Sequence, residues 1–489
     1  MTTNSPLTPD MKLIDPPSLP TGPPVGGDNA PGPPVGADGA PGPPSGDDEA
    51  LKMFLVRPTA DPLSGAFDRK FVIHAGLASK PTPPEEIQAA YERLLESRPD
   101  RGLGLYVHIP FCRSQCLYCG FGGPRPEPAV AAAYVEALLA ELEWLKDKAA
   151  AAGPVRVIYL GGGTPTSLAP DLLGRLMDSV GKNLDLANDC EITLEGRLHD
   201  FTPEKTSGFL AAGFNRFSIG VQSFDTRIRQ SLGRLSPRAT VVEYLENLIS
   251  RQKAAVIIDL IYGLPGQSPD DFIDDLKQAE ALGLDGLDAY QLNIFKGGQL
   301  AGAIESGRLT EAAPLSAQGE YYRRAGEYLL GRRWRQLSLS HFALSARERN
   351  LYNPWAKRRG DCLALGAGAG GFFSGWSFYR RPRVEAYLEA CRRGLFLPDA
   401  LSPPAPNGRL VSFIVEQMEQ GYLNHRRLTE DFMADPAPLR LLLENWAENG
   451  LMIMDDEWAT MTMTGRFWGV NLTQAVIETA SRNMKENQQ

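Results

Sequence analysis

The amino-acid sequence predicts an α/β fold, a partial (β/α)6 barrel of the TIM type, with a small helical domain after it and a disordered tail before it. Six strand-like apolar runs alternate with helical stretches between residues 101 and 400, and this alternation is typical of parallel strands joined by helical crossovers. A stretch rich in proline, Leu401–Arg409, separates this region from a largely helical C-terminal part. The first 50 residues contain almost nothing apolar.

The tail, residues 1–50, carries a ten-residue repeat that begins at Gly22 as GPPVGGDNAP. A segment with so little apolar surface to bury does not offset the entropy lost on folding, so we expect it to be disordered. Residues 51–100 form an N-terminal extension with one amphipathic helix, Pro84–Glu96. We expect this extension to pack outside the main domain.

The predicted barrel spans residues 101–400. A helix is expected at Ala129–Ala150, and a second at Pro269–Leu282, where Ser268 suits the N-cap and Pro269 the first turn. The expected strands are Leu105–Ile109, Val155–Leu160, Glu191–Leu194, Arg216–Val221, Val256–Ile261 and Leu287–Phe295.

The C-terminal domain, residues 401–489, combines helices with two short β-like runs and resembles a small winged-helix-like lid. Leu439, Leu442 and Trp446 recur at helical intervals, and the runs follow at Gly450–Met454 and Trp458–Thr462. This domain is not basic, so a DNA-binding role is not expected.

Composition excludes several classes of protein. The net charge of −9 argues against a general nucleic-acid binder. The sequence contains no run of about eighteen apolar residues, so it predicts no membrane-spanning helix. The first thirty residues lack the pattern of a secretory signal. Six cysteines, of which three are clustered, do not make a disulfide framework. We therefore expect a cytoplasmic protein without a nucleic-acid partner.

The three clustered cysteines form the strongest chemical signal in the sequence. Cys112, Cys116 and Cys119 lie in the stretch LYVHIPFCRSQCLYCGFG, so one short loop can place three thiolates around one inorganic centre. A cubane iron–sulfur cluster takes four thiolates, and a loop with three leaves one iron open for another ligand. The alternative is a structural zinc site, with His108 as the fourth ligand.

Polar residues follow or interrupt the predicted strands, where a barrel places its chemistry. They are the GGGTP sequence at Gly161–Pro165, Glu195, Gln222, Asp259 and Asn293. Asp259 lies within the apolar run VIIDLIYG, and a carboxylate in a buried strand is costly unless it has a partner. A ligand-binding role or a satisfied internal hydrogen bond would each account for it.

The cysteine motif and GGGTP together resemble the radical S-adenosylmethionine (SAM) superfamily, in the branch typified by oxygen-independent coproporphyrinogen III oxidase. The resemblance implies that Cys112, Cys116 and Cys119 bind a [4Fe–4S] cluster whose open iron is chelated by SAM. It also implies two SAM molecules in one site. The cofactor-binding residues that it implies are Tyr106, Tyr118, Gly162, Gly163, Thr164 and Glu195 and, for the second SAM, Gln222, Arg234 and Asp259, to which we add Asn293 in the sixth run.

One segment departs from the oxidase pattern. The oxidases carry Ser-Asn-Phe-Ala followed by Arg-His-Asn, whereas this chain has His341 in place of the asparagine and reads Glu-Arg-Asn from Glu348. With DLIYGLPGQ at Asp259–Gln267 and LGAGAGG at Leu365–Gly371, it resembles the heme-utilisation subgroup of the HutW/ChuW type, the anaerobilin synthases. That subgroup consists of radical SAM methyltransferases that open heme without oxygen, giving a linear tetrapyrrole and free iron.

The resemblance implies heme as the substrate and an electron donor such as flavodoxin or ferredoxin. We hypothesise that His341 is catalytic, either as a ligand of heme iron or as a proton-transfer group. Arginines between residues 323 and 393 are candidates for binding the propionates, and LGAGAGG for a turn beside a SAM site. Two other functions in the same branch remain open: a coproporphyrinogen oxidase-like enzyme and a heme chaperone.

Overall fold

The computed structural model describes residues 47–72, 74–76, 79–97, 102–149, 153–405 and 407–486. The predicted tail, residues 1–50, lies outside these residues except for its last four, which begin helix α1 (Asp47–Phe54). Among the described residues, no helix has both the length and the apolar character needed to cross a membrane.

One large sheet of twelve strands organises the molecule. All six predicted strands are present, and each pairs in parallel with the next along the chain. They are β1 (Leu103–Ile109), β2 (Val155–Gly162), β3 (Leu186–Gly196), β4 (Arg216–Gln222), β5 (Ala255–Tyr262) and β6 (Gly286–Gln291). Every residue of β1 is buried, as expected for a parallel strand covered on both faces.

Short strands extend this parallel sheet at both ends, and the sequence did not predict them. β9 (Cys362–Leu365) pairs in parallel with the free edge of β1, and antiparallel strands follow it. Beyond β6 the sheet also turns antiparallel. The added strands are β10 (Gly370–Phe373), β11 (Trp376–Tyr379) and β12 (Ala400–Ser402) at one end, and β8 (His341–Ala343) and β7 (Arg335–Gln336) at the other.

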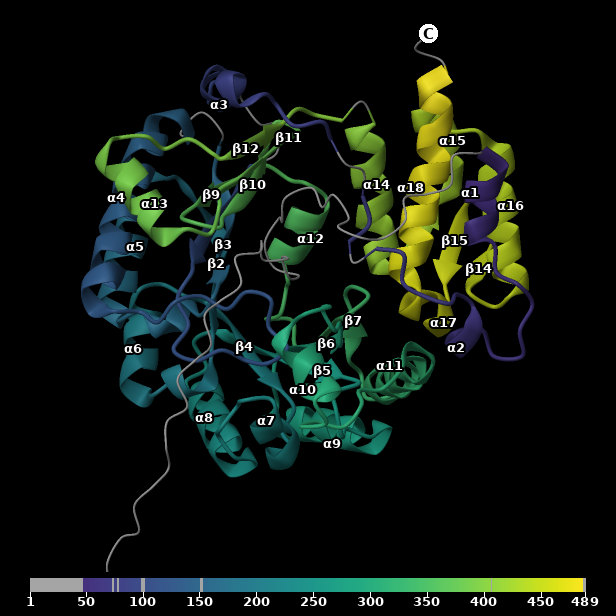
Figure 1. The fold of residues 1–489 in the computed structure, drawn as a ribbon, viewed down its shortest axis with the longest axis horizontal. Coiled ribbons are helices and arrows are strands. Elements are labelled where there is room, and N and C mark those ends of the chain that lie inside the picture. The colour runs from purple at the N-terminus through teal and green to yellow at the C-terminus, as the bar shows by residue number, and fades with distance from the viewer. Residues whose placement is uncertain are drawn as a thin grey trace, which may run out of the picture.

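Helices cover the outer side of the sheet in an arc (Figure 1), and consecutive ones pack against each other. They are α4 (Pro128–Ala149), α5 (Pro170–Asn183), α6 (Pro203–Ala211), α8 (Arg238–Ser250), α9 (Pro269–Leu282) and α11 (Leu315–Leu330). The prediction for α9 is correct to the residue, because Ser268 and Asp271 form a capping box and Gly283 ends the helix in a left-handed conformation.

Shorter helices complete the main domain. α12 lies on the inner side of the arc in Figure 1, and α13 packs on α4. Their bounds are α7 (Thr226–Ser231), α10 (Gln299–Glu305), α12 (Tyr352–Lys357) and α13 (Val384–Arg392), with 3-10 turns at Pro84–Glu86, Pro165–Ser167 and Leu198–Asp200.

The C-terminal part forms a helical unit around a small antiparallel sheet in the order β13, β15, β14. Its core is continuous with that of the main domain. The helices are α14 (Gly408–Gln420), α15 (His425–Phe432), α16 (Pro436–Glu448), α17 (Met463–Phe467) and α18 (Gly469–Glu486), and the strands are β13 (Tyr422–Asn424), β14 (Met452–Met454) and β15 (Trp458–Met461).

The N-terminal extension packs on both the C-terminal unit and the main domain, and the neighbouring purple and yellow ribbons of Figure 1 show the first of these contacts. Helix α1 lies on α18, and α2 (Pro62–Gly65) lies on α11 and α17. The indole of Trp446 donates to the carbonyl oxygen of Phe54 (2.9 Å), and the rings of Phe67 and Trp468 meet edge to face, with centroids 5.4 Å apart. Helix α3 (Ile87–Leu95) instead packs on β12 of the main sheet.

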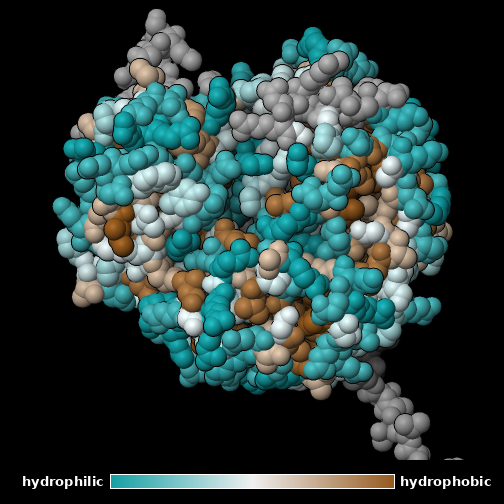
Figure 2. Space-filling view, turned by 180° about the vertical axis from the view of Figure 1, so that it is seen from behind, coloured by the Kyte–Doolittle hydropathy of each residue, from teal (hydrophilic) through white to brown (hydrophobic). Residues whose placement is uncertain are grey.

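The reverse face of the molecule is largely hydrophilic, with hydrophobic residues in several small areas (Figure 2). Large exposed hydrophobic side chains such as Leu235, Met433 and Ile453 lie in three different parts of the chain.

Candidate cofactor site

The cysteine loop leaves the carboxyl end of β1. Cys112 and Cys116 are buried and Cys119 is half-buried. The thiol of Cys112 lies 3.5 Å from the hydroxyl of Thr164, and the amide of Phe121 donates to the sulfur of Cys119 over 3.3 Å. The loop is therefore joined to the GGGTP turn after β2.

Two arginines set the charge around the thiols. The guanidinium of Arg197 donates a hydrogen bond to the sulfur of Cys116. Burial raises the pKa of the Cys116 thiol, but the nearby charges of Arg234 and Arg197 outweigh it and lower the pKa overall. Burial dominates at Cys119 and raises the pKa of that thiol to about 11. The protein thus favours the thiolate more at Cys116 than at Cys119.

Loops after other strands hold the cysteine loop in place. The amide of Leu117 donates to the carbonyl of Leu232 (3.3 Å), and Arg234 donates to the hydroxyl of Tyr118 (2.7 Å). On the other side, the side chain of Gln299 donates to that of Gln115 (3.1 Å). The connections that follow β4 and β6 thus fix the position of the cysteines.

Two glycines of GGGTP are required because neighbouring atoms leave no room for a side chain. Gly162 has a φ of +107°, and a Cβ there would lie 2.7 Å from the ring of His108. A Cβ on Gly163 would lie 2.7 Å from the carbonyl oxygen of Phe111. Gly368, in the LGAGAGG turn, packs on the opposite side of the same region, because its Cβ would lie 3.0 Å from the His108 ring.

LGAGAGG therefore lies next to the cysteine motif. It connects β9 to the antiparallel strand β10, so it is not the turn of a βαβ dinucleotide-binding unit.

His108 is engaged away from the thiols. Its Nδ1 lies 2.9 Å from the hydroxyl of Tyr106, and burial lowers the pKa of the imidazole to about 4. Across the part of the chain that the structure describes, no three His, Cys, Asp or Glu side chains converge on a single ion. A cubane places its thiolates on separate irons, so it does not need such convergence.

The inner face of the sheet carries the other predicted residues. Because side chains alternate between faces, the register that pairs Tyr106 with Tyr159 and Tyr159 with Thr193 puts all three on one side. Tyr159 stacks on Tyr352 of α12, with ring centroids 4.3 Å apart, and donates a hydrogen bond to Glu195. The predicted residues Tyr106 and Glu195 thus lie in a shared aromatic and polar layer.

A second layer crosses four strands in one row. The Cα atoms of Gly220, Asp259, Asp288 and His341 are paired in sequence across β4, β5, β6 and β8. Arg234 closes the row at the β4 end, donating to the carbonyl oxygen of Gly220 over 2.5 Å.

Gln222, at the end of β4, has the features of a functional residue. Its φ of +69° is unusual for a side chain other than glycine, and the strand register is irregular beside it. Its Oε1 atom is buried and has no hydrogen-bond partner among the described residues. An orphaned acceptor in this position fits a ligand that donates a hydrogen bond.

Asp259 is only weakly satisfied within the protein. Its Oδ1 accepts from the hydroxyl of Ser218 over 3.4 Å. Burial, followed by the charges of Asp288 and Glu195, raises the pKa of Asp259 to about 7. One long hydrogen bond does not account for this carboxyl, which favours the ligand-binding interpretation.

The prediction for the sixth strand requires a correction. The sixth strand was expected to reach Phe295, but β6 ends at Gln291 and Asn293 is exposed in the following loop. The chain leaves the sheet after Gln291 and turns toward α10, with Gly297 at a positive φ. Asn293 thus lies outside the inner face.

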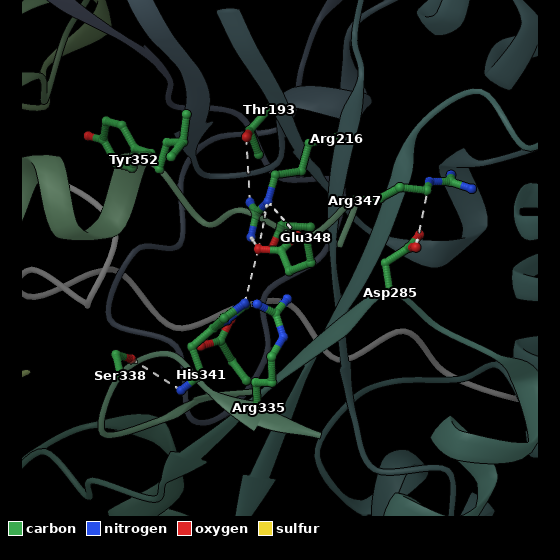
Figure 3. A network of polar contacts seen from close by, with 12 residues as sticks. Thr193, Arg216, Asp285, Arg335, Ser338, His341, Arg347, Glu348 and Tyr352 are labelled. Atoms are coloured by element: carbon green, nitrogen blue, oxygen red, sulfur yellow. Dashed lines mark hydrogen bonds and ion pairs between the residues drawn. The ribbon is translucent and has the colours of Figure 1, made fainter. Parts of the chain in front are cut away.

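His341 lies in a buried network (Figure 3). The side chain is fully buried, with Nδ1 2.9 Å from an oxygen of Asp288 and Nε2 3.0 Å from an oxygen of Glu348. Burial lowers the pKa of His341, but the two carboxylates outweigh it and raise the pKa to about 9. The raised pKa favours the protonated ring, in which both nitrogens donate to these carboxylates.

Arg216 continues the network. Its guanidinium binds both oxygens of Glu348, with Nε 3.0 Å from Oε2 and Nη2 3.0 Å from Oε1. Burial raises the pKa of Glu348, but Arg216 and then His341 outweigh it and lower the pKa to about 2. Sequence reasoning missed Asp288, Arg216 and Glu348 as site residues, although charged side chains in strand-like runs were a signal for the first two.

Most of the arginines proposed for propionates already have partners. Arg380 is buried in an ion pair with Glu141, Arg347 lies 3.6 Å from Asp285, and Arg349 lies 3.4 Å from Asp189.

Comparison with known proteins decides the family. The radical SAM superfamily model matches residues 106–279. The anaerobilin synthase of Escherichia coli O157:H7 is 34% identical over 400 residues, which are 81% of this chain and 89% of that protein. The chain belongs to the radical SAM superfamily, in the HemN-like branch.

Two further relatives have other functions. The oxygen-independent coproporphyrinogen III oxidase of Pseudomonas aeruginosa is 29% identical over 74% of this chain and 83% of that protein. The heme chaperone HemW of Mycobacterium tuberculosis is 35% identical over 45% of this chain and 56% of its own length. The structure of coproporphyrinogen III oxidase (HemN) from Escherichia coli shares the fold, with a TM-score of 0.71 at 21% identity over 83% of this chain and 96% of that one.

The residues present fit the cofactors that radical SAM proteins carry. Three thiols on one loop supply three of the four thiolates of a cubane. The glycine backbone at Gly162 and Gly163 has no room for side chains, and the orphaned Gln222 oxygen offers an acceptor to SAM.

Proposed function

We propose that this radical SAM enzyme opens the porphyrin ring of heme without oxygen, transferring a one-carbon unit from SAM and giving a linear tetrapyrrole and free iron. The observation that carries the proposal is the similarity to an anaerobilin synthase over 81% of this chain and 89% of that protein. The reaction uses two SAM molecules, and a small electron-transfer protein such as flavodoxin or ferredoxin reduces the cluster.

The cofactors supply the radical chemistry and the protein supplies orientation. When bound, the cluster and SAM provide one-electron cleavage of the sulfonium, which yields a radical able to attack the macrocycle. In this proposal Cys112, Cys116 and Cys119 hold the cluster. The backbone of Gly162 and Gly163 and the hydroxyl of Thr164 receive the SAM that chelates it.

The remaining residues bind and orient the two SAM molecules. Glu195 contacts one SAM, and Gln222, Arg234 and Asp259 contact the second. Tyr106 and Tyr118 support these contacts through their hydrogen bonds to His108 and Arg234. Asn293 lies exposed in the loop after β6, and in this proposal it contacts the cofactor from the rim of the site.

The His341 network favours this function over that of the oxidase. The chain departs from the oxidase pattern at His341, Glu348 and Arg349, and in the structure His341 contacts Glu348. A paired change inside the sheet indicates an altered site rather than drift at the surface. We therefore assign His341 a positioning role, and neither iron ligation nor proton transfer is part of the proposal.

Anaerobic incubation of the reconstituted enzyme with heme, SAM and a reductant tests the proposal. Mass spectrometry should show a linear, methylated tetrapyrrole, and an iron chelator should capture one iron per product. Loss of carboxyl groups from coproporphyrinogen III would instead support the oxidase function. Intact heme that remains bound would support the heme chaperone.

A further inference from the structure

Asp288 has a binding capacity that the roles above leave unused. It lies in the row that joins Asp259 on β5 to His341 on β8 and is 2% exposed. Its Oδ2 is paired with the His341 ring, but its Oδ1 is buried without a hydrogen-bond partner among the described residues. Burying a carboxylate oxygen without a hydrogen-bond donor is unfavourable, so this oxygen marks a place where a donor belongs.

The network behind Asp288 fixes its position. His341 donates to Asp288 and to Glu348, and Arg216 grips both oxygens of Glu348. These four side chains are almost fully buried, so they have little freedom to rotate. Asp288 is consequently held with one oxygen occupied and the other free.

The charges around the free oxygen define the ligand. Neighbouring strands lie about 4.8 Å apart, so the carboxyls of Asp259 and Asp288 stand side by side on one face of the sheet. Gln222 adds a second unsatisfied acceptor, near the end of β4. The charged groups that face Asp259 are Asp288, Glu195, Arg216 and Arg234. Two adjacent carboxyls repel an anion and attract a cation that donates hydrogen bonds.

We propose that Asp288 is a further binding residue of the cofactor site, an anionic acceptor for a cationic ligand of the sulfonium and ammonium class that lies against Asp259 and Gln222. The identification of this ligand as the second SAM rests on the proposed function. The preference for a cation rests only on the geometry and charge of the site.

The test measures SAM binding to the cluster-loaded protein without heme, by anaerobic calorimetry and equilibrium dialysis. The wild-type protein should bind two equivalents of SAM. Asp288→Asn keeps the shape of the side chain and removes the charge, so it should weaken one of the two sites about 10- to 100-fold, the range of a charge-assisted hydrogen bond.

S-adenosylhomocysteine tests the role of charge, because it is almost the same shape as SAM but lacks the sulfonium. At the site that Asp288→Asn weakens, the wild-type protein should bind SAM more tightly than S-adenosylhomocysteine. Asp288→Asn should reduce that difference in affinity. Asp285→Asn is the matched control. Asp285 is also a buried aspartate, placed just before β6 at the end away from the cofactors, where it accepts from Ser345 and from the amide of Val256.

Equal iron content and circular dichroism in the three proteins establish that the variants are folded and loaded. Unchanged SAM stoichiometry and affinity in Asp288→Asn, or equal weakening in Asp285→Asn, overturns the inference. If Asp288→Asn weakens one SAM site but the wild-type protein does not convert heme, the inference about Asp288 stands and the proposed function is wrong.

Discussion

The Nε2 atom of His341 lies 3.0 Å from an oxygen of Glu348, and these are the two residues that replace the asparagine and the arginine of the oxidase pattern. An arginine at position 348 would face Arg216, which now binds both oxygens of Glu348. A carboxylate there removes that repulsion and also fixes the new imidazole. The two substitutions therefore form one structural unit.

Glu348→Gln should be strongly destabilising. It leaves the buried Arg216 without its ion-pair partner, and breaking a buried pair in this way costs about 3–5 kcal/mol. The thermal midpoint of the apo-protein should fall by several degrees. Glu327→Gln, at an exposed pair with Arg323, should change stability by less than about 0.5 kcal/mol. Equal effects of the two substitutions would contradict the account.

Stability should depend on pH through His341. Its pKa is raised from 6.5 to about 9 in the folded protein, so its contribution is complete below pH 6.5 and is lost as the pH rises through 9. The shift corresponds to roughly 3 kcal/mol. A plot of thermal midpoint against pH should decline over this interval in the wild type and decline less in His341→Asn. Parallel curves would show that the imidazole is not the cause.

Glu348, the partner of His341, has the opposite effect on the pH dependence of stability. The pKa of Glu348 is lowered from 4.5 to about 2, so its contribution is present above pH 4.5 and is lost as the pH falls through 2. Glu348→Gln should therefore flatten the acid limb of the curve.

Heme should bind without iron ligation by His341, because both ring nitrogens are occupied. Anaerobic titration of heme into His341→Asn should give the same Soret position as the wild type. A shift of the Soret band would show that His341 reaches the iron after all. The circular dichroism spectrum of the variant serves as the control for folding.

Gly162→Ala should abolish cofactor loading. The new methyl group would lie 2.7 Å from the ring of His108 at a φ of +107°, and both the clash and the backbone strain act at the GGGTP turn. Iron content after reconstitution and SAM binding should both fall. Gly174→Ala lies in helix α5 with open space around it, and it should stabilise the protein by about 0.5–1 kcal/mol.

The extent of successful prediction differs between the sheet and the site. Long apolar runs predicted all six parallel strands, and the alternation of side chains along them brought Tyr106, Glu195 and Asp259 to the inner face. The strands β7 to β12 are two to four residues long, too short for any periodicity to be visible.

The partners of His341 were equally hidden, because they depend on long-range contacts. Asp288 is 53 residues away, and Arg216 lies 132 residues from Glu348. Asn293 was misplaced because the apolar run continues past the last residue that pairs in the sheet.

The contact between the N-terminal extension and the C-terminal unit has a consequence for synthesis on the ribosome. Phe54 and its partner Trp446 are 392 residues apart, and at about 5–20 residues per second the ribosome needs roughly 20–80 s to reach the second from the first. Throughout that time Phe54 and Phe67 lack their C-terminal partners Trp446 and Trp468. A transcript that ends early therefore yields a barrel with exposed aromatic residues, which chaperones and proteases can distinguish from the finished protein.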